Sequence, residues 1–195
     1  GFSPVRMDHL VALAGLEALP DPQMVNEMRT HMLRADAPTP SVEAILHALI
    51  PHRFVDHTHA DAIVTITNTP DGEARIRDLF GDEVIVLPYV MPGFDLAKLC
   101  AEVFPKQATS RTIGMVLMNH GIFSFGDTAK QSYERMIELV GRAEDYLNRN
   151  AALLPATEIA STANWLALSE LRKKVSAAAG FPLLLRSCSS AAALA

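Results

Sequence analysis

Residues 112–126 read TIGMVLMNHGIFSFG, and this segment carries the most information about the fold. Two apolar runs, residues 112–118 and 122–125, have the length and composition of buried strand. Asn119-His120-Gly121 lies between them. We interpret the segment as one buried strand that these three residues interrupt. A histidine at that place costs free energy unless its ring has a partner, so it is a candidate functional residue.

Helices and short strands are mixed on both sides of this segment. Apolar spacing, proline breaks and capping residues predict helices over 7–19, 22–35, 40–50, 73–80, 95–104, a long stretch after 127, and 157–178, with a buried strand over 83–88. Residues 60–67 are too short to separate helix from strand. The order lacks a regular strand–helix alternation. It predicts a three-layer α/β domain with a central, mainly antiparallel sheet between helices, over residues 1–180, with 181–195 as a tail or the start of a linker.

Composition excludes several classes of protein. The chain has 195 residues, 49% of them hydrophobic, and 17 Lys+Arg against 22 Asp+Glu give a net charge of −5. This balance is typical of one globular domain and argues against nucleic acid or an anionic membrane surface as a partner. No apolar run approaches the roughly 18–20 residues that span a bilayer. Cys100 and Cys188 have no metal-like spacing, which indicates reduced thiols in a cytoplasmic protein.

Three histidines form a candidate metal site. His57 and His59 are two residues apart in a stretch that begins extended, and alternation would place both rings on one face of a strand. Zinc favours imidazole nitrogen, and catalytic zinc sites have three protein ligands and an open position. A pair of surface or hydrogen-bonded histidines would show the same spacing. His120 supplies a third candidate ligand, although hydrogen bonding within the core would also explain it.

Glu43 is a candidate acid/base. It lies in the first turn of the predicted third helix, where the helix dipole alone favours an acidic residue. Its short separation along the chain from His57 makes it a candidate for proton transfer, and burial against an apolar helix face is expected to raise its pKa. The remaining histidines are interpreted as structural or solvated; they are His9, His31, His47 and His52. The sequence lacks a Gly-x-Ser-x-Gly elbow and a Gly-x-Gly-x-x-Gly motif.

The order of these motifs resembles the class II aldolase/adducin head family. The resemblance covers about residues 38–150 and rests on four segments: Pro40–Glu43, His57–Ala62, Pro88–Gly93 and Leu117–Gly121. Within the family, residues 51–62, 119–128 and 171–180 look most like the aldolase domain of bifunctional rhamnulose-1-phosphate aldolase/short-chain dehydrogenase proteins.

The resemblance implies a role for each candidate residue. His57, His59 and His120 would bind Zn²⁺ or another divalent metal, Glu43 would be the acid/base, and Ser41 would help to hold the substrate phosphate. The family fold is a mainly antiparallel sheet between helical layers, assembled as a homotetramer. The implied reaction is retro-aldol cleavage of a ketose 1-phosphate of the rhamnulose or fuculose type to dihydroxyacetone phosphate and an aldehyde.

Two alternatives to an aldolase stay open. The family includes a sugar-phosphate epimerase, a dehydratase and a decarboxylase that use the same metal site, and adducin-like heads that are non-catalytic interaction modules. The sequence also departs from the family pattern, because no Gly/Ser-rich phosphate loop precedes Glu43 and no dehydrogenase module follows residue 195. We therefore expect the chain to be a piece of a longer protein.

Overall fold

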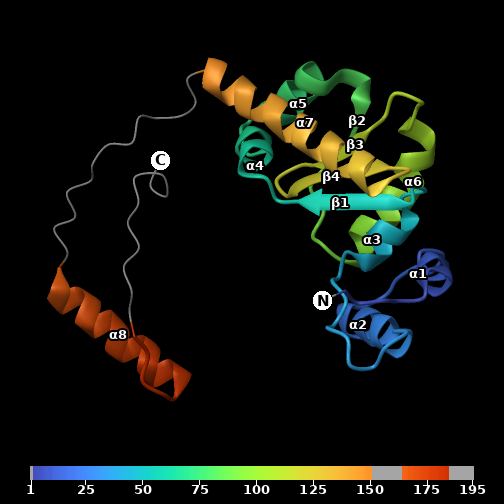
Figure 1. Cartoon of the computed structure of the whole chain (residues 1–195). Coiled ribbons are helices and arrows are strands. Elements are labelled where there is room, and N and C mark those ends of the chain that lie inside the picture. Colours follow the sequence, from blue (N-terminus) through green and yellow to red (C-terminus); the bar gives the residue numbers. More distant parts are fainter. Residues whose placement is uncertain (1, 151–163, 185–195) are drawn as a thin grey trace. The chain divides into compact units, whose positions relative to one another are not determined.

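A four-stranded sheet lies at the centre of the computed structural model, which describes residues 2–150 and 164–184 (Figure 1). The strands are β1 (Phe54–Thr58), β2 (Val84–Leu87), β3 (Gly114–Leu117) and β4 (Gly121–Gly126). They are ordered β1-β4-β3-β2. β4 runs antiparallel to both β1 and β3, and only β2 and β3 pair in parallel. The predicted mainly antiparallel sheet is therefore confirmed.

Helices cover both faces of this sheet and complete the three predicted layers. The residues of one face share an apolar core with α1 (Met7–Leu13), α2 (Asp21–Thr30), α3 (Ala44–Leu49) and α6 (Phe94–Gln107). The other packs against α4 (Asp61–Thr67), α5 (Gly72–Phe80) and α7 (Ala129–Arg149), with a short 3₁₀ turn, η1 (Gly81–Glu83), leading into β2. Each face of the sheet has its own apolar core: the first core lies on the side of α1, α2, α3 and α6, and the second on the side of α4, α5 and α7. Successive residues of β2 face opposite sides, so Ile85 belongs to the first core and Val86 to the second.

The segment that was interpreted as one interrupted strand is a hairpin. Leu117 pairs with Gly121, and the chain reverses between β3 and β4 through residues 118–120. Asn119 has φ +58° there, a left-handed conformation that asparagine tolerates better than most residues. The interpretation was wrong because the apolar runs look the same whether the chain continues or turns back between them. The left-handed asparagine makes the turn.

Several helices are shorter than the sequence predicts. The helix predicted over 7–19 ends at Leu13, and Leu16 beyond it is 42% exposed, so apolar spacing there does not reflect burial. The helix predicted over 22–35 ends at Thr30, and the one predicted over 40–50 begins at Ala44. Residues 60–67, which were undecided, form the helix α4.

The chain divides into two units, residues 1–147 and 148–195, and each is described by itself. The described part of the second unit contains α8 (Trp165–Ala179), whose Asn164 side chain accepts a hydrogen bond from the backbone of Ala167. Gly180 ends α8 at φ +76°, as predicted. Residues 157–163 of the predicted last helix, and Cys188, lie outside the described residues. The domain boundary at residue 180 stays a prediction.

Within residues 2–150 and 164–184, no helix is both long and apolar enough to cross a membrane.

Candidate metal centre

His57 is fixed by the sheet. It lies on β1 opposite Phe123 of β4, and its ring stacks on the Phe123 ring with centroids 4.0 Å apart. Its Nδ1 lies 3.0 Å from the carbonyl oxygen of Ile122, which can only accept, so Nδ1 carries the proton and donates. This hydrogen bond leaves Nε2 with its lone pair directed away from the strand pair, the arrangement that metal-binding histidines use.

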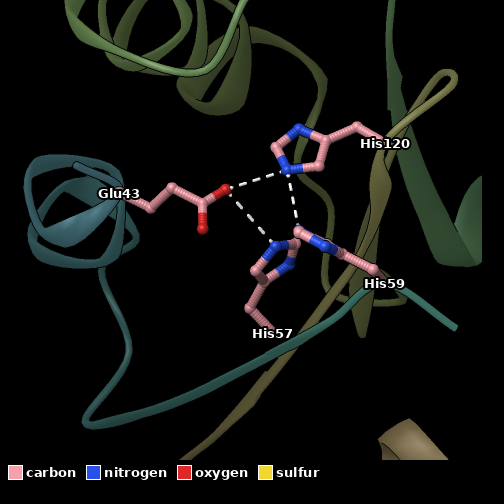
Figure 2. A group of neighbouring side chains, drawn as sticks. All are labelled: Glu43, His57, His59 and His120. Atoms are coloured by element: carbon pink, nitrogen blue, oxygen red, sulfur yellow. Dashed lines mark hydrogen bonds and ion pairs between the residues drawn. The ribbon is translucent and has the colours of Figure 1, made fainter. Parts of the chain in front are cut away.

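His59 and His120 reach the same place from neighbouring parts of the sheet. His59 follows β1 directly, and His120 lies in the turn before β4, its hydrogen-bonded neighbour. The two Nε2 atoms are 3.0 Å apart. Figure 2 shows both rings turned toward the His57 ring and the Glu43 carboxylate. The three histidine rings therefore lie close together, as the sequence predicted.

Gly121 allows this close approach. A Cβ at position 121 would overlap the carbonyl oxygen of Thr58 and would lie 3.1 Å from the rings of both His57 and His59. Any larger residue would push the end of β1 away from β4. The glycine that follows His120 is therefore part of the site's construction.

Glu43 completes the cluster from the opposite side. It is the N-cap residue of α3, and its Oε1 lies 3.3 Å from His57 Nε2 and 3.0 Å from His120 Nε2. Its backbone N–H donates to Ser41 Oγ at 3.2 Å, so Ser41 holds the backbone that carries the carboxylate. The structure thus brings four of the five candidate residues together directly. Ser41 joins them through its bond to Glu43.

The donor set fits a divalent metal ion. Zn–N and Zn–O bonds of about 2.0–2.2 Å place tetrahedral ligands about 3.3 Å apart, close to the 3.0–3.3 Å that separate the facing atoms here. Glu43 Oε1 and His57 Nε2 are buried, and neither makes a hydrogen bond of good geometry with any described residue. Buried polar atoms without partners are costly, and a shared cation would satisfy both. Each of the four residues offers one ligand atom.

The electrostatics favour the ionisation states that metals bind. The His57 ring beside Glu43 lowers the pKa of that carboxyl, and His120 and His59 add to the effect against an opposing contribution from burial. The expected rise in the Glu43 pKa is therefore wrong in its net direction. Burial lowers the pKa of His120, partly opposed by the charge of Glu43. Near neutral pH the site holds a carboxylate and a neutral imidazole, as ligation requires.

Two further residues support the site, and neither was predicted to do so from the sequence. Asn119 donates from its side-chain amide to the carbonyl oxygen of Thr67 and to the side chain of Asn68, which holds the turn that carries His120. His47, one helical turn after Glu43, packs edge-on against Phe123 with centroids 5.1 Å apart. The spacing of Glu43 and His47 was visible in the sequence, whereas their contact with the sheet was not.

Comparison with known proteins agrees with this geometry. Residues 10–147 match the family model described as "Class II Aldolase and Adducin N-terminal domain". The chain belongs to this family. The matched residues of this class II aldolase-family chain coincide closely with the unit that contains the sheet and the histidines.

A solved structure of an N-terminal class II aldolase domain, from a conserved protein of Thermoplasma acidophilum, is 42% identical to the class II aldolase-family chain. Its TM-score is 0.69, and the match covers 75% of this chain and 67% of that one. A curated relative, "Uncharacterized oxidoreductase YuxG" of Bacillus subtilis, is 36% identical over 148 residues. That match covers 75% of this chain but only 21% of the relative, so this chain spans about a fifth of its length.

Two more distant structures show the fold alone. An aldolase II superfamily protein from Pseudomonas syringae is 14% identical, with a TM-score of 0.50 over 75% of this chain and 68% of that one. A sugar-phosphate aldolase from Thermotoga maritima is 17% identical, with a TM-score of 0.50 over 64% of this chain and 60% of that one. Both share the class II aldolase fold with this family member.

Proposed function

We propose that this chain is a metal-dependent aldolase that cleaves a ketose 1-phosphate of the rhamnulose or fuculose type to dihydroxyacetone phosphate and an aldehyde. The observation that carries the proposal is the convergence of Glu43, His57, His59 and His120 at ligand distances. Membership of the class II aldolase and adducin family supports an aldolase reaction, and the intact set of donors favours catalysis over a purely structural domain.

The three histidines would hold the ion, which we expect to be Zn²⁺ or another divalent metal. Such an ion supplies Lewis acidity to the carbonyl and adjacent hydroxyl oxygens of a bound ketose phosphate. His57 and His120 have only 9% and 7% of their side chains exposed, whereas His59 is exposed. The substrate would therefore approach from the side of His59.

Glu43 would move the proton. Retro-aldol cleavage removes a proton from the C4 hydroxyl, breaks the C3–C4 bond and returns a proton to C3. The ionised Glu43 would accept the proton of the C4 hydroxyl as a base and, once protonated, would donate it to C3 as an acid. The lowered pKa of Glu43 keeps it ionised and ready to accept a proton. Its position 3.0–3.3 Å from two histidine nitrogens supports this role, because a substrate held beside those nitrogens would lie within reach of the carboxylate.

Ser41 would contact the substrate phosphate. Its Oγ accepts the N–H of Glu43, which leaves the hydroxyl hydrogen free to be donated to a phosphate oxygen. The residue is exposed, as a substrate contact requires before binding. The closer resemblance to rhamnulose-1-phosphate aldolase/dehydrogenase fusions, the homotetramer and the cytoplasmic location stay predictions.

A panel of ketose 1-phosphates, with product analysis before and after chelation, tests the proposal. An aldolase releases dihydroxyacetone phosphate, and chelation abolishes this release until a divalent metal is restored. An epimerase would return an isomeric sugar phosphate, and a dehydratase or decarboxylase would release water or carbon dioxide without a carbon–carbon aldol cleavage. A protein that binds no metal and cleaves nothing would instead be an adducin-like interaction module.

A further inference from the structure

A second cluster of metal-binding side chains lies between α1 and α2. His9 of α1 places Nε2 2.9 Å from Glu27 Oε2, and His31 at the end of α2 places Nδ1 3.8 Å from the same oxygen. The ligand atoms of the three residues all lie within 4.8 Å of one another. None of them belongs to the centre around Glu43.

Backbone pairing between the residues before α1 and those after α2 holds this cluster together. Glu27 and His31 are four residues apart, which places them on one face of α2. Arg6 donates its backbone N–H to the carbonyl oxygen of His31 at 3.0 Å, and this bond ties the start of α1 to the end of α2. Buried apolar residues of both helices, Leu10, Leu13, Met24 and Met28, form part of the first core beside it.

Each histidine has its own hydrogen-bond partner on Glu27: His9 Nε2 lies 2.9 Å from the carboxylate oxygen Oε2, and His31 Nδ1 lies 2.7 Å from the backbone carbonyl oxygen. The rings of His9 and His31 also stack, with centroids 3.2 Å apart and planes 10° apart, which places both rings beside one carboxylate. Two stacked rings repel if both are protonated and share one negative charge. A divalent cation would instead use both rings and the carboxylate.

We infer that His9, Glu27 and His31 form a second divalent metal site that clamps α1 to α2. Two imidazole nitrogens and one carboxylate oxygen are a donor set that suits Zn²⁺, Co²⁺, Ni²⁺ or Cu²⁺ better than Mg²⁺ or Ca²⁺. Because α1 packs against α3, whose N-cap residue is Glu43, an ion there also steadies the helix that carries Glu43.

Binding at this second site requires a rearrangement. His31 Nδ1 lies 2.7 Å from the carbonyl oxygen of Glu27 and donates to it, so that nitrogen must lose its proton and its partner before it binds a metal. The two rings must also tilt apart, because a nitrogen lone pair lies in the plane of its ring. The second site therefore binds its ion more weakly than the first.

Zinc stoichiometry tests the inference. Equilibrium dialysis against Zn²⁺, with metal counted by mass spectrometry, should give two ions per chain for the wild type and one for His9→Ala and for Glu27→Gln. His52→Ala is the matched control, since it removes a histidine outside both clusters and should keep two ions. Circular dichroism checks that each variant is folded. Zinc should also raise the Tm of the wild type more than that of Glu27→Gln.

A variant with His57, His59 and His120 all changed to alanine separates the two sites. It should keep one ion, and adding His9→Ala should remove that ion. A wild type that binds one ion, lost in the triple variant and kept in His9→Ala, would overturn the second site while leaving the first intact. Two ions retained by both His9→Ala and Glu27→Gln would also overturn it.

Discussion

Two clusters of histidine and glutamate differ in how the fold holds them. In the first, His57 lies on β1, and His59 and His120 lie at the adjoining ends of β1 and β4, whose hydrogen-bonded pairing brings them together. In the second, His9 lies on the short helix α1, and Glu27 and His31 lie at the end of α2. In the first cluster, the Nε2 atoms of His59 and His120 are 3.0 Å apart and the two ring planes make an angle of 61°. In the second, the rings of His9 and His31 are stacked nearly parallel. A sheet preorganises ligands for an ion, whereas this helix pair must rearrange to accept one.

The two clusters also differ in how far their side chains are buried. The side chains of His57 and Glu43 are 9% and 13% exposed, whereas those of His9 and Glu27 are 25% and 33% exposed. Charges interact more strongly where water is excluded. The lower exposure of the first cluster is consistent with the proposed catalytic centre, and the higher exposure of the second is consistent with the proposed weaker metal site.

Removal of a ring from the first cluster should have the largest effect. His120→Ala should lose the ion and reduce aldol cleavage about a thousandfold or more, since the Lewis acidity of a metal is worth several kcal/mol. Steady-state kinetics and metal analysis of the same preparation measure both. His9→Ala, the corresponding change in the second cluster, should keep the ion of the first and most of the activity. Equal losses in the two variants would contradict the proposed difference.

Removal of the proton-transfer group should have the next largest effect. Glu43→Gln keeps the size of the side chain, and the three histidines should retain the ion, while kcat falls by about 10²–10⁴ through loss of the acid/base. Metal content and kcat are measured together. Glu27→Gln is the matched change in the second cluster and should leave kcat nearly unchanged. Full activity in Glu43→Gln would contradict the assigned role.

The sheet's part in the first cluster can be tested at Gly121. Gly121→Ala should separate β1 from β4, weaken metal binding about 10–100-fold and cost about 1–3 kcal/mol of stability, because the new Cβ meets the Thr58 carbonyl. Gly141→Ala in α7 is the control, since no atom lies within 4 Å of its Cβ. That variant should be slightly stabilised by higher helix propensity. Zinc titration and urea unfolding compare the two, and unchanged zinc affinity in Gly121→Ala would refute the argument.

Acidification should give the smallest effect, measured on chelator-treated protein. Burial lowers the pKa of His120 from its ordinary 6.5, so between the folded value and 6.5 the unfolded chain binds more protons, and stability falls as the pH falls. The Glu43 pKa is also lowered, from 4.5, so its contribution is present above 4.5 and is lost below it. Urea unfolding at several pH values should show both declines. His120→Asn should flatten the first decline, and an unchanged slope in that variant would refute this assignment.

Only part of the first cluster could be predicted from local patterns. The spacing of His57 and His59 is local, although the structure places only His57 on β1 and His59 just after it. His120 and Glu43 come from other segments of the chain, and the resemblance to a known family linked them to the histidine pair. The hairpin at Asn119 was missed because its two apolar runs do not reveal whether the chain turns. Helix ends were missed because Leu16 continues the apolar spacing without being buried.

The second cluster was missed for a different reason. His9 and His31 were interpreted as structural or solvated, although the spacing of Glu27 and His31 already placed them on one helix face. What brings His9 to them is the backbone pairing of the residues before α1 with those after α2, and no spacing along the chain encodes that contact. Neither a local pattern nor the resemblance to a known family pointed to this second cluster.

Anomalous diffraction from zinc-soaked crystals, recorded on both sides of the zinc absorption edge, would locate the ions themselves. We predict the strongest peak between Nε2 of His57, His59 and His120, beside Oε1 of Glu43, and a weaker peak between α1 and α2. A map with no peak among the three histidines would contradict the metal centre on which the proposed function rests.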